Sequence, residues 1–146
     1  AKYATELPKA GTVAPDFTLS SLDGNTISLS DFKGKYVVLD FWASWCPDCI
    51  RDIPEIRSLY NDFSDKGVVF LGVSFDTDKT RWQTAVEKYD IKYPQCSELK
   101  KMREAEVAKL YGVKWIPSLV VVAPDGKVAL STVISQKVRA LLSERI

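Results

Sequence analysis

YVVLDFWASWCPDCI, residues 36–50, joins a nearly continuous apolar run to two cysteines that are three positions apart. An apolar run of this kind is typical of a strand that is covered on both faces in a parallel sheet. From Pro47 to about Phe63 the apolar residues recur at helical spacing, which indicates an amphipathic helix. We therefore expect a buried strand that ends just before the cysteines and a helix that begins at Pro47.

Cysteines at this spacing can be zinc ligands, a structural disulfide or a redox-active pair. A structural zinc site needs four ligands, and the chain offers no histidine and only Cys96 as a further cysteine. A disulfide across so short a loop would constrain the unfolded chain very little. The redox interpretation is favoured, because Cys46 opens a helix whose free N–H groups and dipole stabilise a thiolate.

The helix start also predicts different roles for the two cysteines. Pro47 suits the first helical position, where the backbone N–H has no partner, and it keeps the preceding Cys46 out of the helical conformation. Cys49 then lies one turn along the helix and faces back toward Cys46. We expect Cys46 to attack a substrate disulfide and Cys49 to resolve the mixed disulfide.

Composition excludes several other functions. A chain of 146 residues suits one domain, and a net charge of +1 without a block of like charges gives no sign of binding to nucleic acid. The absence of histidine excludes His-based acid–base catalysis, and we expect no metal and no other cofactor. There is no run of 18 apolar residues and no signal peptide, and the chain begins at Ala1, so no targeting segment indicates a compartment.

The remaining pattern predicts alternating strands and helices. Residues 1–11 are expected to be a lead-in or linker, and residues 12–146 a single domain. Asp23-Gly24 between alternating runs predicts a hairpin. Further strands are expected at 68–75, 118–123 and 127–134, and helices at 80–90, at about 99–111, and from a capping Ser135 to Ile146, with a short strand before the second of these helices.

Two motifs resemble those of the thioredoxin superfamily. VVLDFWASWCPDC, with Pro54 five residues later, is similar to its active-site strand and helix, and YGVKWIPSLVVVAPDGKV is similar to its second signature. The hairpin APDFTLSSLDGNTISLSDFKGK resembles the TlpA/ResA branch. This resemblance, from about Ala14 to Ile146, implies an α/β, thioredoxin-like three-layer fold with a mixed central sheet, an N-terminal β-hairpin and an inserted segment at about 77–100.

The resemblance implies a set of site residues. Pro117 matches the cis-proline that lies against the cysteines, and Ile116 before it would offer its backbone to the substrate. Asp40 matches a buried acid beneath Cys49 that takes its proton. The residues expected to bind substrate are Trp45, Pro47, Asp48, Ile116 and Pro117. The alternatives are a trans proline at an edge strand, a core aromatic at Trp45 and a solvent-facing acid at Asp40.

Two further residues, Asp76 and Cys96, each have two interpretations. Asp76 could be an extra acid near the site, but a plain loop residue is the favoured interpretation. Cys96 is expected to be a free, packed cysteine, with a third redox cysteine as the alternative.

Asp48 bears on the direction of electron transfer. Its charge disfavours the Cys46 thiolate and therefore stabilises the disulfide form, so we expect a reduction potential nearer about −270 mV, as in thioredoxin, than about −120 mV, as in DsbA.

The resemblance implies partners and a place. Proteins of this branch are extracytoplasmic bacterial thiol-disulfide oxidoreductases, often membrane-tethered, which suggests reduction of apocytochrome c or other exported thiol proteins. Client proteins and an upstream electron donor are the expected partners, any tether would lie outside this chain, and a monomer is expected.

Two rival functions are a peroxidase and a redox-silent binding module. Peroxiredoxin-like chains carry Thr or Ser where this chain has Ala43, and the presence of both cysteines argues against a redox-silent module.

Overall fold

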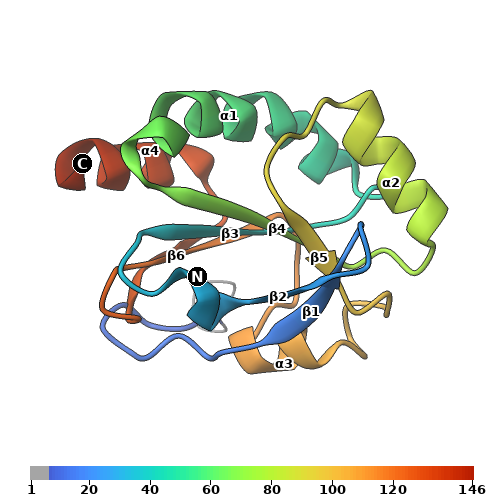
Figure 1. Ribbon diagram of the computed structural model, residues 1–146, viewed down its shortest axis with the longest axis horizontal. Coiled ribbons are helices and arrows are strands. Elements are labelled where there is room, and N and C mark those ends of the chain that lie inside the picture. The colour runs from blue at the N-terminus through green and yellow to red at the C-terminus, as the bar shows by residue number, and fades with distance from the viewer. Residues whose placement is uncertain (1–6) are drawn as a thin grey trace.

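Seven strands form one mixed sheet in the order β2-β1-β5-β4-β3-β6-β7, with helices on both of its faces (Figure 1). The computed structural model describes residues 7–146. The strands are β1 (Thr18–Ser21), β2 (Thr26–Ser28), β3 (Val37–Trp42), β4 (Val69–Ser74), β5 (Gln95–Ser97), β6 (Ser118–Val122) and β7 (Val128–Thr132). The helices are α1 (Pro47–Phe63), α2 (Lys79–Lys88), α3 (Glu106–Tyr111) and α4 (Ser135–Arg145).

The sheet combines a parallel centre with antiparallel flanks. β3, β4 and β5 run parallel, whereas β6 and β7 on one side and β1 and β2 on the other are antiparallel to their neighbours. The hairpin turns at Gly24, which has a φ of 88°. β5 comes from the inserted segment and joins this hairpin to the central strands. The expected α/β fold, with its mixed sheet, hairpin and insertion, is confirmed.

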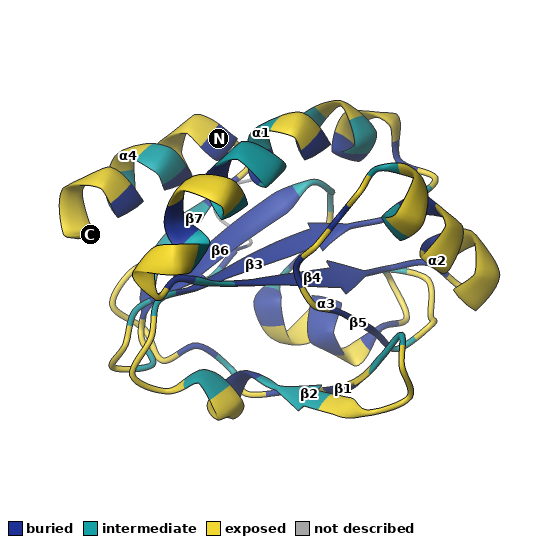
Figure 2. Cartoon of the chain, turned by 45° about the horizontal axis from the view of Figure 1, so that its top comes forward, coloured by how far each residue is buried: buried dark blue, intermediate teal, exposed yellow. Residues whose placement is uncertain are grey.

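Helices cover both faces of β3, the strand that leads to the cysteines. α1 and α4 lie on one face and α3 on the other (Figure 1), and the central strands are buried throughout (Figure 2). On the α3 face, Phe41 packs against Phe75 and Tyr111. On the α1 face, the rings of Tyr60, Phe70 and Tyr93 contact one another. The two faces of the sheet therefore carry separate aromatic clusters.

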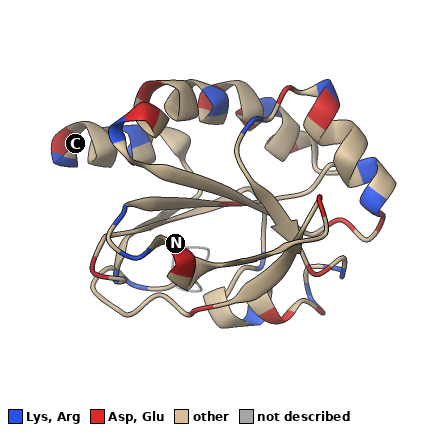
Figure 3. Ribbon diagram, viewed as in Figure 1, with Lys and Arg blue, Asp and Glu red and all other residues tan. Residues whose placement is uncertain are grey.

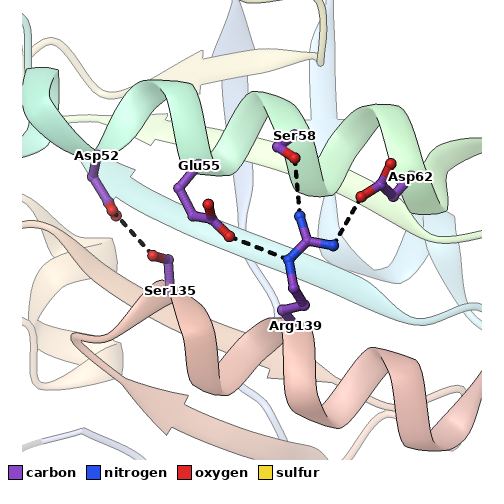
Figure 4. Close-up of polar contacts among 6 residues, drawn as sticks. All are labelled: Asp52, Glu55, Ser58, Asp62, Ser135 and Arg139. Atoms are coloured by element: carbon purple, nitrogen blue, oxygen red, sulfur yellow. Dashed lines mark hydrogen bonds and ion pairs between the residues drawn. The ribbon is translucent and has the colours of Figure 1, made fainter.

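Polar contacts join α4 to α1 (Figure 4). The Arg139 guanidinium donates to Glu55, Ser58 and Asp62, which are spaced along α1. At the start of α4 the Ser135 hydroxyl donates to Asp52 at 3.1 Å. These contacts fix α4 along α1 and bring its first turn close to the cysteine end of α1.

The chain before β1 runs along β7. Residues 1–6 of the expected lead-in lie outside the described residues. Leu7 is buried, the Ser131 hydroxyl donates to the carbonyl of Pro8 at 2.6 Å, and Val13 forms an isolated bridge with Lys127. The described part of the lead-in is thus hydrogen-bonded to the far edge of the sheet.

The helix predicted at about 99–111 is wrong over its first half, because α3 begins only at Glu106. Leu99 has a positive φ of 57°, which interrupts a helix, and its N–H bonds to the Ser97 hydroxyl. The Glu98 carboxylate accepts the N–H groups of Glu106 and Val107. A carboxylate from the segment just before α3 therefore caps the helix and sets its start.

The predicted capping role of Ser135 is also wrong. Ile134 is the N-cap of α4, and Ser135 is its first helical residue. The Thr132 hydroxyl oxygen accepts the N–H of Ile134, and the Ser135 hydroxyl is turned toward Asp52 instead. The local pattern predicted that this hydroxyl caps the backbone of α4, but it bonds to a side chain of α1 instead.

Among residues 7–146, none of the helices has the length and apolar character needed to cross a membrane.

A buried amide lies across Gly72 in the middle of the sheet. The Gln95 side-chain oxygen accepts the indole N–H of Trp42 at 2.9 Å and that of Trp82 at 3.3 Å. Gly72 pairs with Gln95 in the sheet, and a Cβ at Gly72 would lie 2.2 Å from the Gln95 side-chain nitrogen. Glycine is therefore required here by space, and Gln95 links β5 to both β3 and α2.

We predict that Gly72→Ala lowers the free energy of unfolding by about 1–3 kcal/mol, because the added methyl group displaces the Gln95 amide. Urea denaturation measures this loss. In a Gln95→Ala background the obstruction is absent, so the same substitution should cost less than in the native chain. An equal cost in both backgrounds would contradict the packing argument.

Candidate redox site

The two cysteines lie at the first turn of α1, a few residues after the end of β3. Cys46 is the N-cap residue, and its sulfur accepts the N–H of Cys49 at 3.2 Å. Both thiols are free, with 5% of Cys46 and 3% of Cys49 exposed. The helix start thus directs a backbone donor and the positive end of its dipole at the sulfur of Cys46.

The loop before β6 meets Cys46 from the opposite side. The Ile116–Pro117 peptide bond is cis, as the resemblance implies. The Cys46 sulfur lies 3.7 Å from the carbonyl oxygen of Ile116, in position to donate its S–H. The expected pair, 70 residues apart in sequence, is therefore brought together at the thiol.

Asp40 is a buried acid on β3, with 5% of the residue exposed. Most other charged residues lie on the helices and in the loops, as Figure 3 shows. Burial raises the pKa of the Asp40 carboxyl from its ordinary value of 3.8 to about 7, against an opposing hydrogen bond from Tyr93. The solvent-facing alternative for Asp40 is excluded by this burial.

The charge of Asp40 also acts on the Cys49 thiol. Burial is the main cause that raises the pKa of the Cys49 thiol, and its contact with Cys46 and the charge of Asp40 raise it further. Cys49 therefore stays protonated at neutral pH, next to a carboxyl that changes its charge near neutral pH. Such a pair is suited to the transfer of a proton from sulfur to carboxylate.

Two polar residues near Asp40 were missed in the sequence. The Tyr93 hydroxyl donates to Asp40 Oδ2 at 3.1 Å from the segment before β5. Asp52 follows Cys49 by one helical turn, and its charge also raises the pKa of Asp40. Helical spacing after Cys49 could have identified Asp52, whereas no local pattern links residues 40 and 93.

Asp76 holds the loop that carries the cysteines. It is buried, and it accepts the backbone N–H of Ser44 at 3.2 Å and the Ser44 hydroxyl at 2.5 Å. The Ser74 hydroxyl donates to its other oxygen at 2.6 Å. The favoured interpretation of Asp76 as a plain loop residue is therefore wrong, because its carboxylate joins the end of β4 to the residues just before Cys46.

The other expected residues lie on the surface around the thiols. Trp45 is 58% exposed, so it is no core aromatic. Asp48 forms an ion pair with Arg51, one turn along α1, and the two side chains are 68% and 74% exposed. The charge of Asp48 is thus paired and faces water, which weakens its effect on Cys46.

A groove of about 560 Å³ runs beside the cis-proline. Its lining residues are Asp48, Arg51, Asp52, Trp115, Ile116, Pro117 and Val133. It joins the first turn of α1 to the loop before β6. Of the residues named from the sequence, Asp48, Ile116 and Pro117 therefore line this groove, whereas Trp45 lines a separate cleft toward α2.

Cys96 lies on β5, fully buried and free, and burial raises the pKa of its thiol to about 12. It belongs to the strand that joins the hairpin to β4. Its expected packed position is confirmed.

Comparison with known proteins places this site in a family. Residues 10–131 match the model of the AhpC/TSA family. The chain is 35% identical over 123 residues to the thiol-disulfide oxidoreductase ResA of Bacillus thuringiensis subsp. konkukian. The aligned region covers 84% of this chain and 69% of that protein.

Solved structures agree with this match. The thioredoxin domain of a thiol-disulfide oxidoreductase from Bacteroides vulgatus superposes with a TM-score of 0.86 at 33% identity, covering 95% of this chain and 99% of that one. A thiol:disulfide interchange protein from Bacteroides sp. gives a TM-score of 0.83 at 33% identity over 95% and 90% of the two chains. The chain thus belongs to the AhpC/TSA family and, within it, to the thioredoxin-fold thiol-disulfide oxidoreductases that include ResA.

Proposed function

We propose that the protein reduces disulfides of exported proteins by dithiol–disulfide exchange through Cys46 and Cys49. The observation that carries this proposal is the unequal setting of the two thiols. Both thiols are buried, but Cys46 lies between the N-terminus of α1 and the backbone of Ile116, whereas Cys49 is subject to the charge of Asp40. The first setting suits attack on a client, and the second suits resolution.

The first step forms a mixed disulfide. The Cys46 thiolate attacks one sulfur of the client disulfide, the client S–S bond breaks, and the other client sulfur leaves as a thiolate. The N–H of Cys49, which points at the Cys46 sulfur, stabilises the negative charge before attack. Ile116 and Pro117 border the groove through which the client segment would reach this sulfur.

The second step releases the client. Asp40, as a carboxylate, takes the proton of Cys49, and the Cys49 sulfur attacks the sulfur of Cys46. The mixed disulfide breaks, and the second client sulfur leaves as a thiolate that is protonated by solvent. The client has gained two electrons and the Cys46–Cys49 pair has lost two. An upstream dithiol electron donor must reduce the pair again before the next turnover.

A peroxidase function is the alternative within the same family. Peroxiredoxin-like chains resemble this one in the opening APDF, but they carry Thr or Ser at the position of Ala43. Ala43 is buried and has no hydroxyl to offer a peroxide. Thiol exchange is therefore favoured, and consumption of peroxide at a rate comparable with disulfide reduction would favour the alternative.

The place of action follows from the resemblance to ResA-like proteins. We propose an extracytoplasmic bacterial location, with a membrane tether outside this chain and with the apocytochrome c thiols as one client class. We propose that the protein acts as a monomer.

Substitution of each cysteine separates the two steps. We predict that Cys46→Ser abolishes disulfide reduction, because no attacking thiol remains, while Cys49→Ser accumulates a mixed disulfide on Cys46. Non-reducing electrophoresis and mass spectrometry of the intact adduct measure this. Cys96→Ser is the matched control and should react as the native chain does. An adduct on Cys49 in the Cys46→Ser variant would reverse the assigned roles.

Removal of the buried acid should slow resolution. We predict that Asp40→Asn lowers the rate at which Cys49 resolves a preformed mixed disulfide by about 100-fold at pH 8, because general-base assistance is lost. In the native chain this rate should rise with pH and level off above the Asp40 pKa of about 7. Stopped-flow fluorescence of the exposed Trp45 measures both rates, and equal rates would contradict a proton-accepting role.

The stability of the same variant provides an independent check. The native carboxyl binds its proton more tightly when folded, at a pKa of about 7 against 3.8. The native free energy of unfolding therefore falls as pH rises from about 4 to about 7. Asp40→Asn should remove this decline. Above pH 7 the free energy of unfolding of the variant should therefore exceed that of the native protein by at most about 4 kcal/mol, since one pKa unit is about 1.4 kcal/mol. Urea denaturation at pH 4.5 and 8 measures it.

The acid between the cysteines should have a small effect. Because Asp48 is paired with Arg51 in water, we predict that Asp48→Asn raises the reduction potential by less than about 30 mV, or about 1.4 kcal/mol. Arg51→Gln leaves the acid unpaired and should lower the potential. Equilibration with glutathione measures both, and the native potential should lie nearer about −270 mV than about −120 mV.

A further inference from the structure

Asp40 has one hydrogen-bond donor among the described residues, the hydroxyl of Tyr93. The distance from Tyr93 Oη to Asp40 Oδ2 is 3.1 Å. Only 3% of Tyr93 and 5% of Asp40 are exposed, so water does not screen this contact. A buried hydrogen bond to a charged acceptor is among the strong ones, and its loss leaves that acceptor without compensation.

The tyrosine ring is fixed from two sides. Its centroid lies 5.7 Å from that of Tyr60 on α1 and 6.2 Å from that of Phe70 on β4. The next residue, Pro94, accepts the N–H of Gly72 at 2.9 Å, which ties the backbone of this segment to β4. The hydroxyl is therefore held at the Asp40 carboxyl by packing and by the sheet, and not by a flexible loop.

We propose that Tyr93 is a positioning residue for the resolving step: its O–H holds Oδ2 of Asp40 and leaves Oδ1 to take the proton from Cys49. This inference rests on the proposed thiol–disulfide exchange and adds a residue to it. The Tyr93 hydroxyl makes no covalent bond and gives up no proton. The proton moves from Cys49 sulfur to Asp40 Oδ1, and the O–H of Tyr93 remains a donor to Oδ2 before and after.

The chemistry of the tyrosine supports a donor role. Burial and the neighbouring charges of Asp40 and Asp52 raise the pKa of Tyr93 well above its ordinary value. The phenol therefore stays neutral at any pH at which the enzyme works. It can donate a hydrogen bond to the carboxylate, but it cannot compete with Asp40 as the base for Cys49.

Among the described residues, the other groups that face Asp40 do not favour its charged form. α1 contributes Asp52 and Cys49, of which Asp52 raises the pKa of Asp40, and the adjoining strands contribute Gly72 and Leu119, which carry no charge. The start of α4 contributes Ser135, whose hydroxyl is bonded to Asp52. Tyr93 is thus the neighbour that favours the carboxylate, and it keeps the acid usable as a base near neutral pH.

The test is Tyr93→Phe, which keeps the ring and removes only the hydroxyl. The rate at which Cys49 resolves a mixed disulfide on Cys46 with a cysteine peptide is measured against pH. We expect the inflection to move upward by about one to two units, and the rate at pH 7 to fall roughly tenfold or more, since a hydrogen bond to a charged group is worth that much. The rate of the first attack by Cys46 should not change.

A control and a second measurement keep the result decisive. Tyr60→Phe makes the same substitution in a ring that contacts Tyr93, and it should leave the inflection in place. A ¹³C NMR titration of the Asp40 carboxyl in the reduced protein reports its pKa without turnover, and it should shift upward in Tyr93→Phe alone. An inflection and a carboxyl titration that both match the native protein would overturn the positioning role.

The failure of this inference is distinct from that of the proposed function. If the native protein forms no mixed disulfide on Cys46, thiol–disulfide exchange itself is wrong. If the native protein reacts as expected and Tyr93→Phe behaves identically, only the role of Tyr93 is wrong. In the double variant Asp40→Asn, Tyr93→Phe the rate should equal that of Asp40→Asn, because the hydroxyl acts through the carboxylate; a further loss would contradict this.

Discussion

A carboxyl group buried in β3 is the constraint around which the site is built. Asp40 lies between β4 and β6 in the sheet, where water cannot stabilise its charge. An isolated charge in such a place is costly. The Asp40 carboxyl accepts a hydrogen bond from the Tyr93 hydroxyl, and burial raises its pKa to about 7. The charge of this acid also acts on Cys49, so the fold and the proposed chemistry both depend on β3.

The rest of the fold brings partners to this strand from distant parts of the chain. The cis-proline loop reaches Cys46 from 70 residues away, and Asp76 at the end of β4 holds Ser44 just before the cysteines. Tyr93 arrives with the insertion, because β5 pairs with β4 and carries the preceding segment over the sheet. The insertion therefore supplies part of the site as well as the strand that ties the hairpin to the core.

The sequence predicts what depends on local pattern or on a family motif. The strand before Cys46, the helix from Pro47 and the cis bond at Pro117 all belong to that group. Contacts that do not follow from a local helix or strand pattern could not be predicted. The late start of α3 is set by the Glu98 carboxylate, and the hydroxyl of Ser135 is taken by Asp52 on another helix. Tyr93 gives no sign of its role, because its apolar ring fits the core whether or not its hydroxyl has a partner.

The groups that face each thiol, more than the residues between the cysteines, distinguish Cys46 from Cys49. Asp48 lies closest in sequence to both, but its charge is paired with Arg51 and exposed to water. Interactions between exposed charges are weak, whereas the same charge in a buried cluster acts strongly. The buried acid Asp40 therefore acts on Cys49, and the N–H groups at the start of α1 act on Cys46. The proposed order of reaction follows from this division: Cys46, which faces the helix start and the Ile116 carbonyl, attacks the client, and Cys49 attacks once Asp40 takes its proton.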